Sequence, residues 1–177
     1  MRILYVIPGP MSRHQGRREL DRRRRFLQER AAPGTEVAVW DVGEGPASIE
    51  STVEEYLAVP PLLEAVARAN TAGYDALVVG CFGDPGVEAA REIASIPIIG
   101  PCEASLLASI PLGHRTSIIT VLESVVHPLR RVARVVGLEG RLASVRSIDV
   151  AVLDLSRDRA RALAAFVDQG RRALQED

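Results

Sequence analysis

The sequence predicts an α/β protein made of two similar lobes, each with a parallel-type sheet flanked by helices. Short β-branched runs alternate with helical patterns, as in a parallel sheet with crossover helices. Several of these runs are apolar almost throughout, which is typical of strands buried on both faces. The expected strands are residues 2–7, 36–40, 76–80, 97–99, 116–120 and 143–148.

Helical patterns fill the intervals between these strands. Residues 17–30 are charged on most sides and carry a thin apolar stripe. Proline suits the first turn of a helix, so we expect helices to begin at Pro60 or Pro61 and at Pro128. The same reasoning makes Asp84-Pro85 an N-cap and first helical position. A last helix is expected over residues 158–174, with a buried side formed by Leu163, Phe166, Val167 and Leu174.

The division of the chain follows from this order of elements. We expect a first lobe over residues 1–100 and a second over residues 101–177. The first lobe runs strand, helix, strand, helix and then the strand before Cys81, whereas the second runs strand, helix, strand, helix and stops. If both halves share one plan, the counterpart of the Cys81 strand should come directly after Asp177. We therefore expect the second lobe to be incomplete and the chain to be a shortened form of a longer protein.

Charge and hydropathy exclude several classes of function. The formal net charge is −1, which gives no general attraction to nucleic acid or to an anionic membrane. The Arg22–Arg25 run is interleaved with acidic neighbours and spreads around a helix, so we expect a solvated face. No apolar run approaches the roughly 20 residues of a membrane span, and the Met1–Val6 start is too short for a signal peptide. We expect a cytoplasmic protein.

The residue types also bear on cofactors. All 22 basic residues are arginine, so no lysine is present to form a Schiff base with pyridoxal phosphate or to hold a nucleotide in a P-loop. The two cysteines form no CxxC pair, and the three histidines are scattered, so no metal-ligand spacing is visible. We expect chemistry without a cofactor or a metal.

Cys81 is the strongest candidate for a catalytic residue. It follows the third expected strand, and ligands bind beyond the carboxyl ends of strands in open parallel sheets. Phe82, Gly83 and Asp84 come next and are expected to contact a substrate. Asp84 should cap the next helix, whose first amides should lower the pKa of the thiol and help to hold a carboxylate. A buried, inert cysteine is the alternative interpretation.

Other strand ends supply candidate binding groups. Thr120 ends a strand of the second lobe, and Glu123 and Ser124 follow it, so hydroxyls and helix amides could form a second carboxylate-binding corner. Ordinary N-capping by Ser124 is an alternative. Ser48 follows the second strand and Ser12 follows the first, so both could line the same crevice. Cys102 follows the fourth strand, where packing under the helix that contains Glu103 is favoured over a second catalytic thiol.

The chain resembles the hydantoin racemase branch of the aspartate/glutamate racemase superfamily. The resemblance runs in order along nearly the whole chain. It rests on residues 2–6, 34–37, 45–50, 73–76, 81–86, 100–105, 112–114 and 141–144.

This resemblance implies two α/β lobes with an active site between them, a homo-oligomer, and a small carboxylate or hydantoin as substrate. It further implies cofactor-independent racemisation by two cysteines on opposite faces of the α-carbon. Cys81 matches the first of them, and the second would lie on the strand expected after Asp177. Thr120 matches a position that contacts polar groups of the substrate.

The chain departs from the family pattern in three ways. The strand with the second cysteine is missing, so this polypeptide alone should not racemise efficiently. Ile7 stands where many relatives have asparagine, and Val121 replaces a second threonine. Two alternatives stay open: a one-thiol decarboxylase of the arylmalonate type, and a non-catalytic protein that binds small acids.

Overall fold

The computed structural model describes residues 1–177 and divides them into two compact units. The first unit contains residues 1–47 and 53–101, and the second contains residues 48–52 and 102–177. Both units have parallel strands with helices packed beside them, which confirms the predicted α/β class. The sequence-based division had assigned residues 48–52 to the first lobe.

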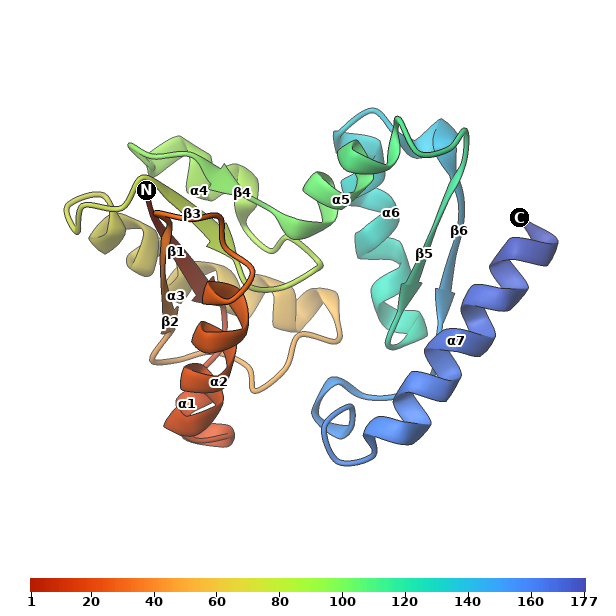
Figure 1. Ribbon diagram of the computed structural model, residues 1–177, viewed down its shortest axis with the longest axis horizontal. Helices are drawn as coiled ribbons and strands as arrows, with labels where there is room; N and C mark the ends of the chain where they lie inside the picture. Colours follow the sequence, from red (N-terminus) through yellow and green to blue (C-terminus); the bar gives the residue numbers. More distant parts are fainter. The chain divides into compact units, whose positions relative to one another are not determined.

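The first unit is built on a four-stranded parallel sheet with the order β2-β1-β3-β4. The strands are β1 (Arg2–Ile7), β2 (Glu36–Asp41), β3 (Ala76–Val79) and β4 (Ile98–Ile99). They begin within one residue of the predicted positions, because long β-branched runs are distinctive in sequence. The helices are α1 (Met11–His14), α2 (Arg17–Gln28), α3 (Thr52–Ala69) and α4 (Val87–Ile93), and α2 lies beside β2 (Figure 1).

The core of the first unit joins α3 to one face of the sheet. Leu4, Val6, Leu77 and Val79 alternate along β1 and β3 toward this face and are fully buried. Residues Leu62, Ala65, Val66 and Ala69 of α3 pack against them. The burial of these side chains supplies most of the stability of this unit.

The predicted start of α3 at Pro60 or Pro61 is wrong. The helix begins at Thr52, and both prolines lie inside it. Each proline removes one backbone hydrogen bond of the helix. The helix nevertheless continues, because Ala58 before the prolines and Leu62 after them are both fully buried in the same unit.

The second unit contains a two-stranded parallel sheet of β5 (Thr116–Thr120) and β6 (Leu142–Ser147). Its helices are α5 (Pro101–Ser109), α6 (Val126–Val135) and α7 (Arg159–Glu176). The predicted start at Pro128 is therefore late by two residues. Cys102 and Leu106 of α5 share a core with Ile118, Leu129 and Val145.

The predicted buried side of α7 is wrong. Leu163 and Leu174 are 63 % and 90 % exposed, and Ala162 is the one buried residue of the helix. The helix lies beside β5 and β6 (Figure 1), with Gly170 close to Ile119. Of the four predicted residues, Phe166 alone is half-buried, while Leu163, Val167 and Leu174 are exposed.

The last turn of α7 is fixed to the sheet by polar contacts. The Asp177 carboxylate accepts hydrogen bonds from Ser117 Oγ (2.7 Å), Ser144 Oγ and Arg146 Nη2 (2.5 Å). These contacts hold the pKa of Asp177 well below its ordinary value, with the hydrogen bond from Arg146 as the largest cause.

No helix of this chain combines the length and the apolar character that crossing a membrane requires.

Candidate active site

Cys81 lies just beyond the carboxyl edge of the first sheet. β3 ends at Val79, and the Gly80 amide still donates a 2.6 Å hydrogen bond to the carbonyl oxygen of Val6. The chain therefore leaves the sheet at Cys81 itself. The residue as a whole is half-buried, while its thiol is shielded enough from solvent for burial to raise its pKa.

The residues after Cys81 form a tight loop. The Asp84 amide donates to the carbonyl oxygen of Cys81 at 3.1 Å, and the backbone of Asp84 has a left-handed conformation with φ of 52°. Gly86, with φ of 67°, ends the loop. A Cβ atom on Gly86 would lie 3.1 Å from the side chain of Val59, so α3 packs closely against this part of the loop.

The expectation that Asp84 caps the next helix is wrong. α4 begins at Val87, Gly86 occupies the N-cap position, and no side chain caps the helix. The Asp84 carboxylate is instead seated against Gly100, where an added Cβ would lie 2.5 Å from its Cγ and Oδ2. Asp84 is buried, so its carboxylate holds the loop to the chain segment after β4.

The predicted lowering of the thiol pKa is also wrong. Burial raises the pKa of Cys81 to about 11, and the negative charges of Asp84 and Glu55 raise it further. A hydrogen bond from the Gly83 backbone opposes this shift but is weaker than the cost of desolvation. The helix amides that were expected to lower the thiol pKa do not do so, because α4 begins six residues after Cys81.

Reasoning from sequence missed two residues that interact with Cys81 and a third that interacts with one of them. Glu55 is a buried carboxylate on α3, and its charge acts on Cys81. Tyr5 on β1 and Arg23 on α2 interact with each other, and Tyr5 also interacts with Cys81. A polar residue at a core position of α3 was the only available signal for Glu55. Nothing in the local sequence indicated Tyr5 or Arg23.

The remaining predicted residues of the Cys81 loop differ in exposure. The Phe82 side chain is 43 % exposed, which is high for a phenylalanine and leaves its ring accessible to a ligand. Gly83 is half-buried, and a Cβ at this position would lie 4.0 Å from Sγ of Cys81. The loop thus brings Cys81, Phe82 and Gly83 together.

The second unit contains the predicted polar residues Thr120, Glu123 and Ser124. Thr120 is buried at the end of β5, and its carbonyl oxygen accepts from the Ile148 amide at 2.9 Å. Glu123 lies two residues beyond the strand and accepts from Ser147 Oγ at 3.3 Å. The Ser124 hydroxyl does not cap a helix; it donates to the carbonyl oxygen of Glu50 at 2.5 Å.

That contact explains why residues 48–52 belong to the second unit. Glu50 accepts a 2.6 Å hydrogen bond from the Val152 amide through its side chain. Its backbone oxygen is held by Ser124 at the same time. Ser48 is half-buried two residues earlier, in the same segment. Glu50 is therefore a structural anchor that places Ser48 in the unit of Thr120 and Ser124.

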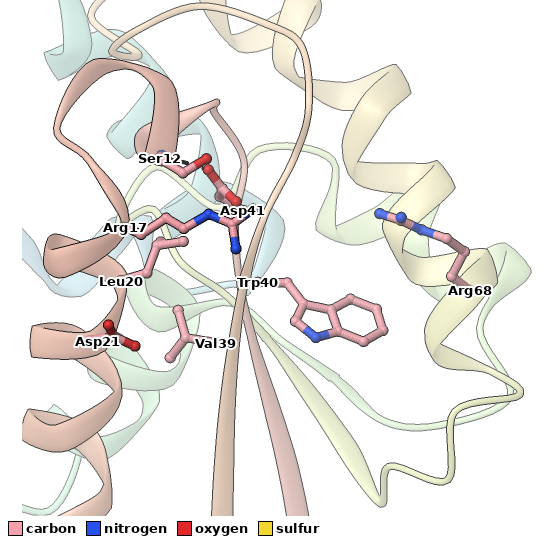
Figure 2. A pocket seen from close by; sticks show the side chains of 8 residues that line it. All are labelled: Ser12, Arg17, Leu20, Asp21, Val39, Trp40, Asp41 and Arg68. Atoms are coloured by element: carbon pink, nitrogen blue, oxygen red, sulfur yellow. Dashed lines mark hydrogen bonds between the residues drawn. The ribbon is translucent and has the colours of Figure 1, made fainter.

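Ser12 lines a cavity of about 500 Å³ that does not include Cys81 (Figure 2). Figure 2 shows residues of α2 on one side of β2 and Arg68 of α3 on the other. The Ser12 amide donates to Asp41 Oδ2 at 2.6 Å, across the ends of β1 and β2. The lining residues are Ser12, Arg17, Leu20, Asp21, Val39, Trp40, Asp41 and Arg68.

Cys102 is fully buried in the core of the second unit. This burial agrees with its expected packing role and leaves no exposed sulfur at that position. Cys81 is therefore the less buried of the two cysteines.

Residues 20–177 match the family described as Asp/Glu/Hydantoin racemase. The chain belongs to this family.

Hydantoin racemases of Pseudomonas sp. (strain NS671) and Rhizobium meliloti are similar to it. The first is 35 % identical over 147 residues, covering 83 % of this chain and 59 % of the relative. The second is 36 % identical over 143 residues, covering 81 % of this chain and 59 % of the relative. The chain thus spans about three fifths of the length of these proteins.

Solved structures agree with the family. Allantoin racemase from Klebsiella pneumoniae superposes with a TM-score of 0.90 at 31 % identity, over 100 % of this chain and 70 % of that one. An arylmalonate decarboxylase variant superposes with a TM-score of 0.56 at 15 % identity, covering 99 % of this chain and 73 % of that one, and so shares the fold alone.

Proposed function

We propose that the protein is a cofactor-independent racemase or epimerase that acts at the carbon α to a carboxylate or a hydantoin carbonyl, with Cys81 as its proton-transfer thiol. The observation that carries this proposal is the half-buried thiol at the carboxyl end of β3, in a loop whose Gly83 backbone is hydrogen bonded to it. The similarity to hydantoin racemases at 35 % identity supports it.

The chemistry follows from the state of the thiol. With a pKa of about 11, Cys81 carries its proton near neutral pH and can act as an acid. A base removes the α-proton from one face, and the electron pair is held as an enolate by the adjacent carbonyl. Cys81 then gives its S–H proton to the other face of the carbon and becomes a thiolate. In the reverse direction, the thiolate removes that proton.

Substrate contacts form the second part of the proposal. The accessible ring of Phe82 would pack against a side chain of the substrate, and the Gly83 turn would approach its carboxylate or carbonyl. Asp84 would act mainly by holding the loop at Gly100. Ser12, Ser48, Thr120, Glu123 and Ser124 stay predicted substrate contacts.

The cellular setting is also a proposal. Two free cysteines fit a reducing compartment such as the cytoplasm. A near-neutral net charge fits a small-molecule enzyme that binds neither nucleic acid nor membrane. A homo-oligomer is expected from the family resemblance.

A panel of optically pure compounds tests the proposed reaction. The full-length protein should interconvert the enantiomers of a 5-substituted hydantoin, followed by chiral chromatography, and Cys81→Ser should reduce the rate by at least a hundredfold. Cys102→Ala is the matched control and should keep the rate within a few-fold. Release of CO₂ from an arylmalonate without racemisation would replace the proposal with a decarboxylase. Ligand-induced thermal stabilisation with no turnover would replace it with a binding protein.

A further inference from the structure

Glu50 joins the two loops that follow the strands of the second sheet. Its side-chain Oε1 accepts a 2.6 Å hydrogen bond from the Val152 amide, in the loop after β6. Its backbone oxygen accepts a 2.5 Å hydrogen bond from Ser124 Oγ, in the loop after β5. The segment of residues 48–52 is therefore bonded to both loops and belongs to the second unit, although residues 1–47 belong to the first.

The loops are also joined to each other through their backbones. The Ile148 amide donates to the carbonyl oxygen of Thr120 at 2.9 Å, and the Val150 amide donates to that of Val121 at 3.1 Å. Two residues further on, the loop after β6 is bonded to the Glu50 side chain instead. Residues 120–124 and 148–152 are therefore connected both directly and through Glu50.

A carboxylate suits the contact with Val152. This residue begins a short 3₁₀ helix, Val152–Asp154, whose N-cap residue Ala151 has no side-chain acceptor. The first amides of a helix need an acceptor from outside the helix, and an ionised carboxylate forms a stronger hydrogen bond with an amide than a neutral group does. Glu50 lies 102 residues away in the sequence, so this contact fixes tertiary structure rather than a local turn.

The contact with Ser124 decides what its hydroxyl can bind. A carbonyl oxygen only accepts hydrogen bonds, so the Ser124 hydroxyl must donate its single hydrogen to Glu50. Its remaining lone pairs can then only accept from a ligand. Glu123, the neighbouring residue, carries a carboxylate that also accepts, from Ser147 Oγ at 3.3 Å. The side chains of Glu123 and Ser124 therefore offer acceptors, which suit an N–H group better than a carboxylate.

We propose that Glu50 is a positioning residue that holds Ser124 as an acceptor for an N–H group of the substrate. This inference rests on the proposed function and names the kind of group that the same site recognises. A hydantoin or another ureide carries such N–H groups. A carboxylate at the same place would be repelled by Glu123 and would find no hydrogen to accept on the Ser124 hydroxyl.

Steady-state racemisation kinetics of the full-length protein test this proposal. Glu50→Ala should raise the KM for (S)-5-methylhydantoin about tenfold and change kcat less than about threefold, because it removes the contact that places Ser124 and leaves Cys81 in place. Glu50→Gln keeps an oxygen acceptor for the Val152 amide and should retain both constants within about threefold. Glu44→Ala is the control, since this exposed glutamate lies six residues earlier and should change neither constant.

Methylated substrates test the hydrogen bond itself. Methylation at N1 or at N3 of the hydantoin removes one N–H group. At least one of the two should raise KM about tenfold in the wild type and less than about threefold in Glu50→Ala, because the variant has already lost the placement of the acceptor. If Glu50→Ala does not fold, as judged by circular dichroism, Glu50→Asp is measured in its place, since it withdraws the carboxylate by one methylene.

Amide hydrogen exchange without substrate separates this inference from the proposed function. Residues 150–152 should exchange faster in Glu50→Ala than in the wild type or in Glu50→Gln. Faster exchange in a protein that racemises nothing would support the role of Glu50 while contradicting the proposed function. The inference is overturned if a folded, active Glu50→Ala protein keeps the wild-type KM and the wild-type response to methylation. It is also overturned if Glu50→Gln loses kcat, which would make the carboxylate catalytic.

Discussion

Asp84 and Gly100 determine the shape of the Cys81 loop, although they are far apart in the sequence. A left-handed backbone at a residue other than glycine costs of the order of 1 kcal/mol. Asp84 holds this conformation with φ of 52°, and its carboxylate occupies the space left by the missing side chain of Gly100. The contact at Gly100 therefore supports a strained residue beside the proposed catalytic thiol.

Gly100→Ala should displace the Asp84 carboxylate, because the new Cβ would lie 2.5 Å from it. We expect a loss of about 1–3 kcal/mol in the free energy of unfolding, measured by urea denaturation. Gly43→Ala is the control, because nothing lies within 4 Å of a Cβ at that position. Equal stability of the two variants would contradict the assigned role of Gly100.

Asp84→Asn should lower the pKa of Cys81 below about 11, because it removes a negative charge that raises this value. The measurement is the rate of Cys81 alkylation by iodoacetamide as a function of pH. The midpoint of this profile should move to lower pH. Glu88→Gln removes an equal charge from an exposed position on α4 and should leave the midpoint in place. A midpoint that stays constant or rises in Asp84→Asn would contradict the electrostatic account.

At the scale of elements, α3 shows how tertiary packing outweighs a local rule. Proline costs about 3 kcal/mol inside a helix. The burial of α3 residues before and after Pro60 and Pro61, among them Ala58, Leu62 and Val66, offsets the cost of both prolines. The helix therefore runs through both prolines and carries Glu55 toward the Cys81 loop.

Leu62→Ala should lower the free energy of unfolding by about 2–5 kcal/mol, because the side chain is fully buried against the sheet. Leu57→Ala, on the same helix, removes a side chain that is 60 % exposed and should cost less than about 1 kcal/mol. Thermal and urea unfolding measure both. Similar losses in the two variants would mean that α3 does not form the core as described.

The end of α7 should respond to acid through Asp177. Since the folded pKa of this carboxyl lies below its ordinary value of 3.8, its contribution to stability is complete above that value. The contribution is lost as the pH falls toward the folded value. Asp177→Asn should therefore destabilise the protein at pH 7 and differ less from wild type at pH 3.

The control for this prediction is Asp168→Asn on the same helix. Asp168 pairs with Arg172 at 3.2 Å, but its side chain is 61 % exposed, so its contribution is small. Urea unfolding at both pH values compares the variants. A larger effect from Asp168 than from Asp177 would contradict the described attachment of α7.

The strands were predictable because they depend on local composition, and the starts of β1, β2 and β5 agree with the sequence to the residue. The starts of α3 and α6 could not be predicted from Pro60 and Pro128. Proline is favoured in the first turn of a helix but is also tolerated further along it where packing is strong. The buried side of α7 was wrong because Gly170, rather than the leucines, approaches the sheet at Ile119, and Ala162 is the buried residue of the helix.

For the whole molecule, the sequence predicted the place of Cys81 after a strand but not the groups that surround it. Cys81 was recognisable from its place after a strand and from the glycines around it. The raised pKa of the Cys81 thiol could not be predicted, because it arises from burial and from the charge of Glu55, which lies on a different element. Glu55 and Gly100 act through contacts between segments distant in the chain, and such contacts leave no local pattern.

Solvent deuterium incorporation tests the account most directly. In D₂O, the full-length protein should replace the α-proton of a 5-substituted hydantoin with deuterium, as followed by proton NMR. Cys81→Ser should reduce this exchange to the uncatalysed rate, and Cys102→Ala should retain it. Undiminished exchange in a folded Cys81→Ser protein would contradict the assignment of proton transfer to this thiol.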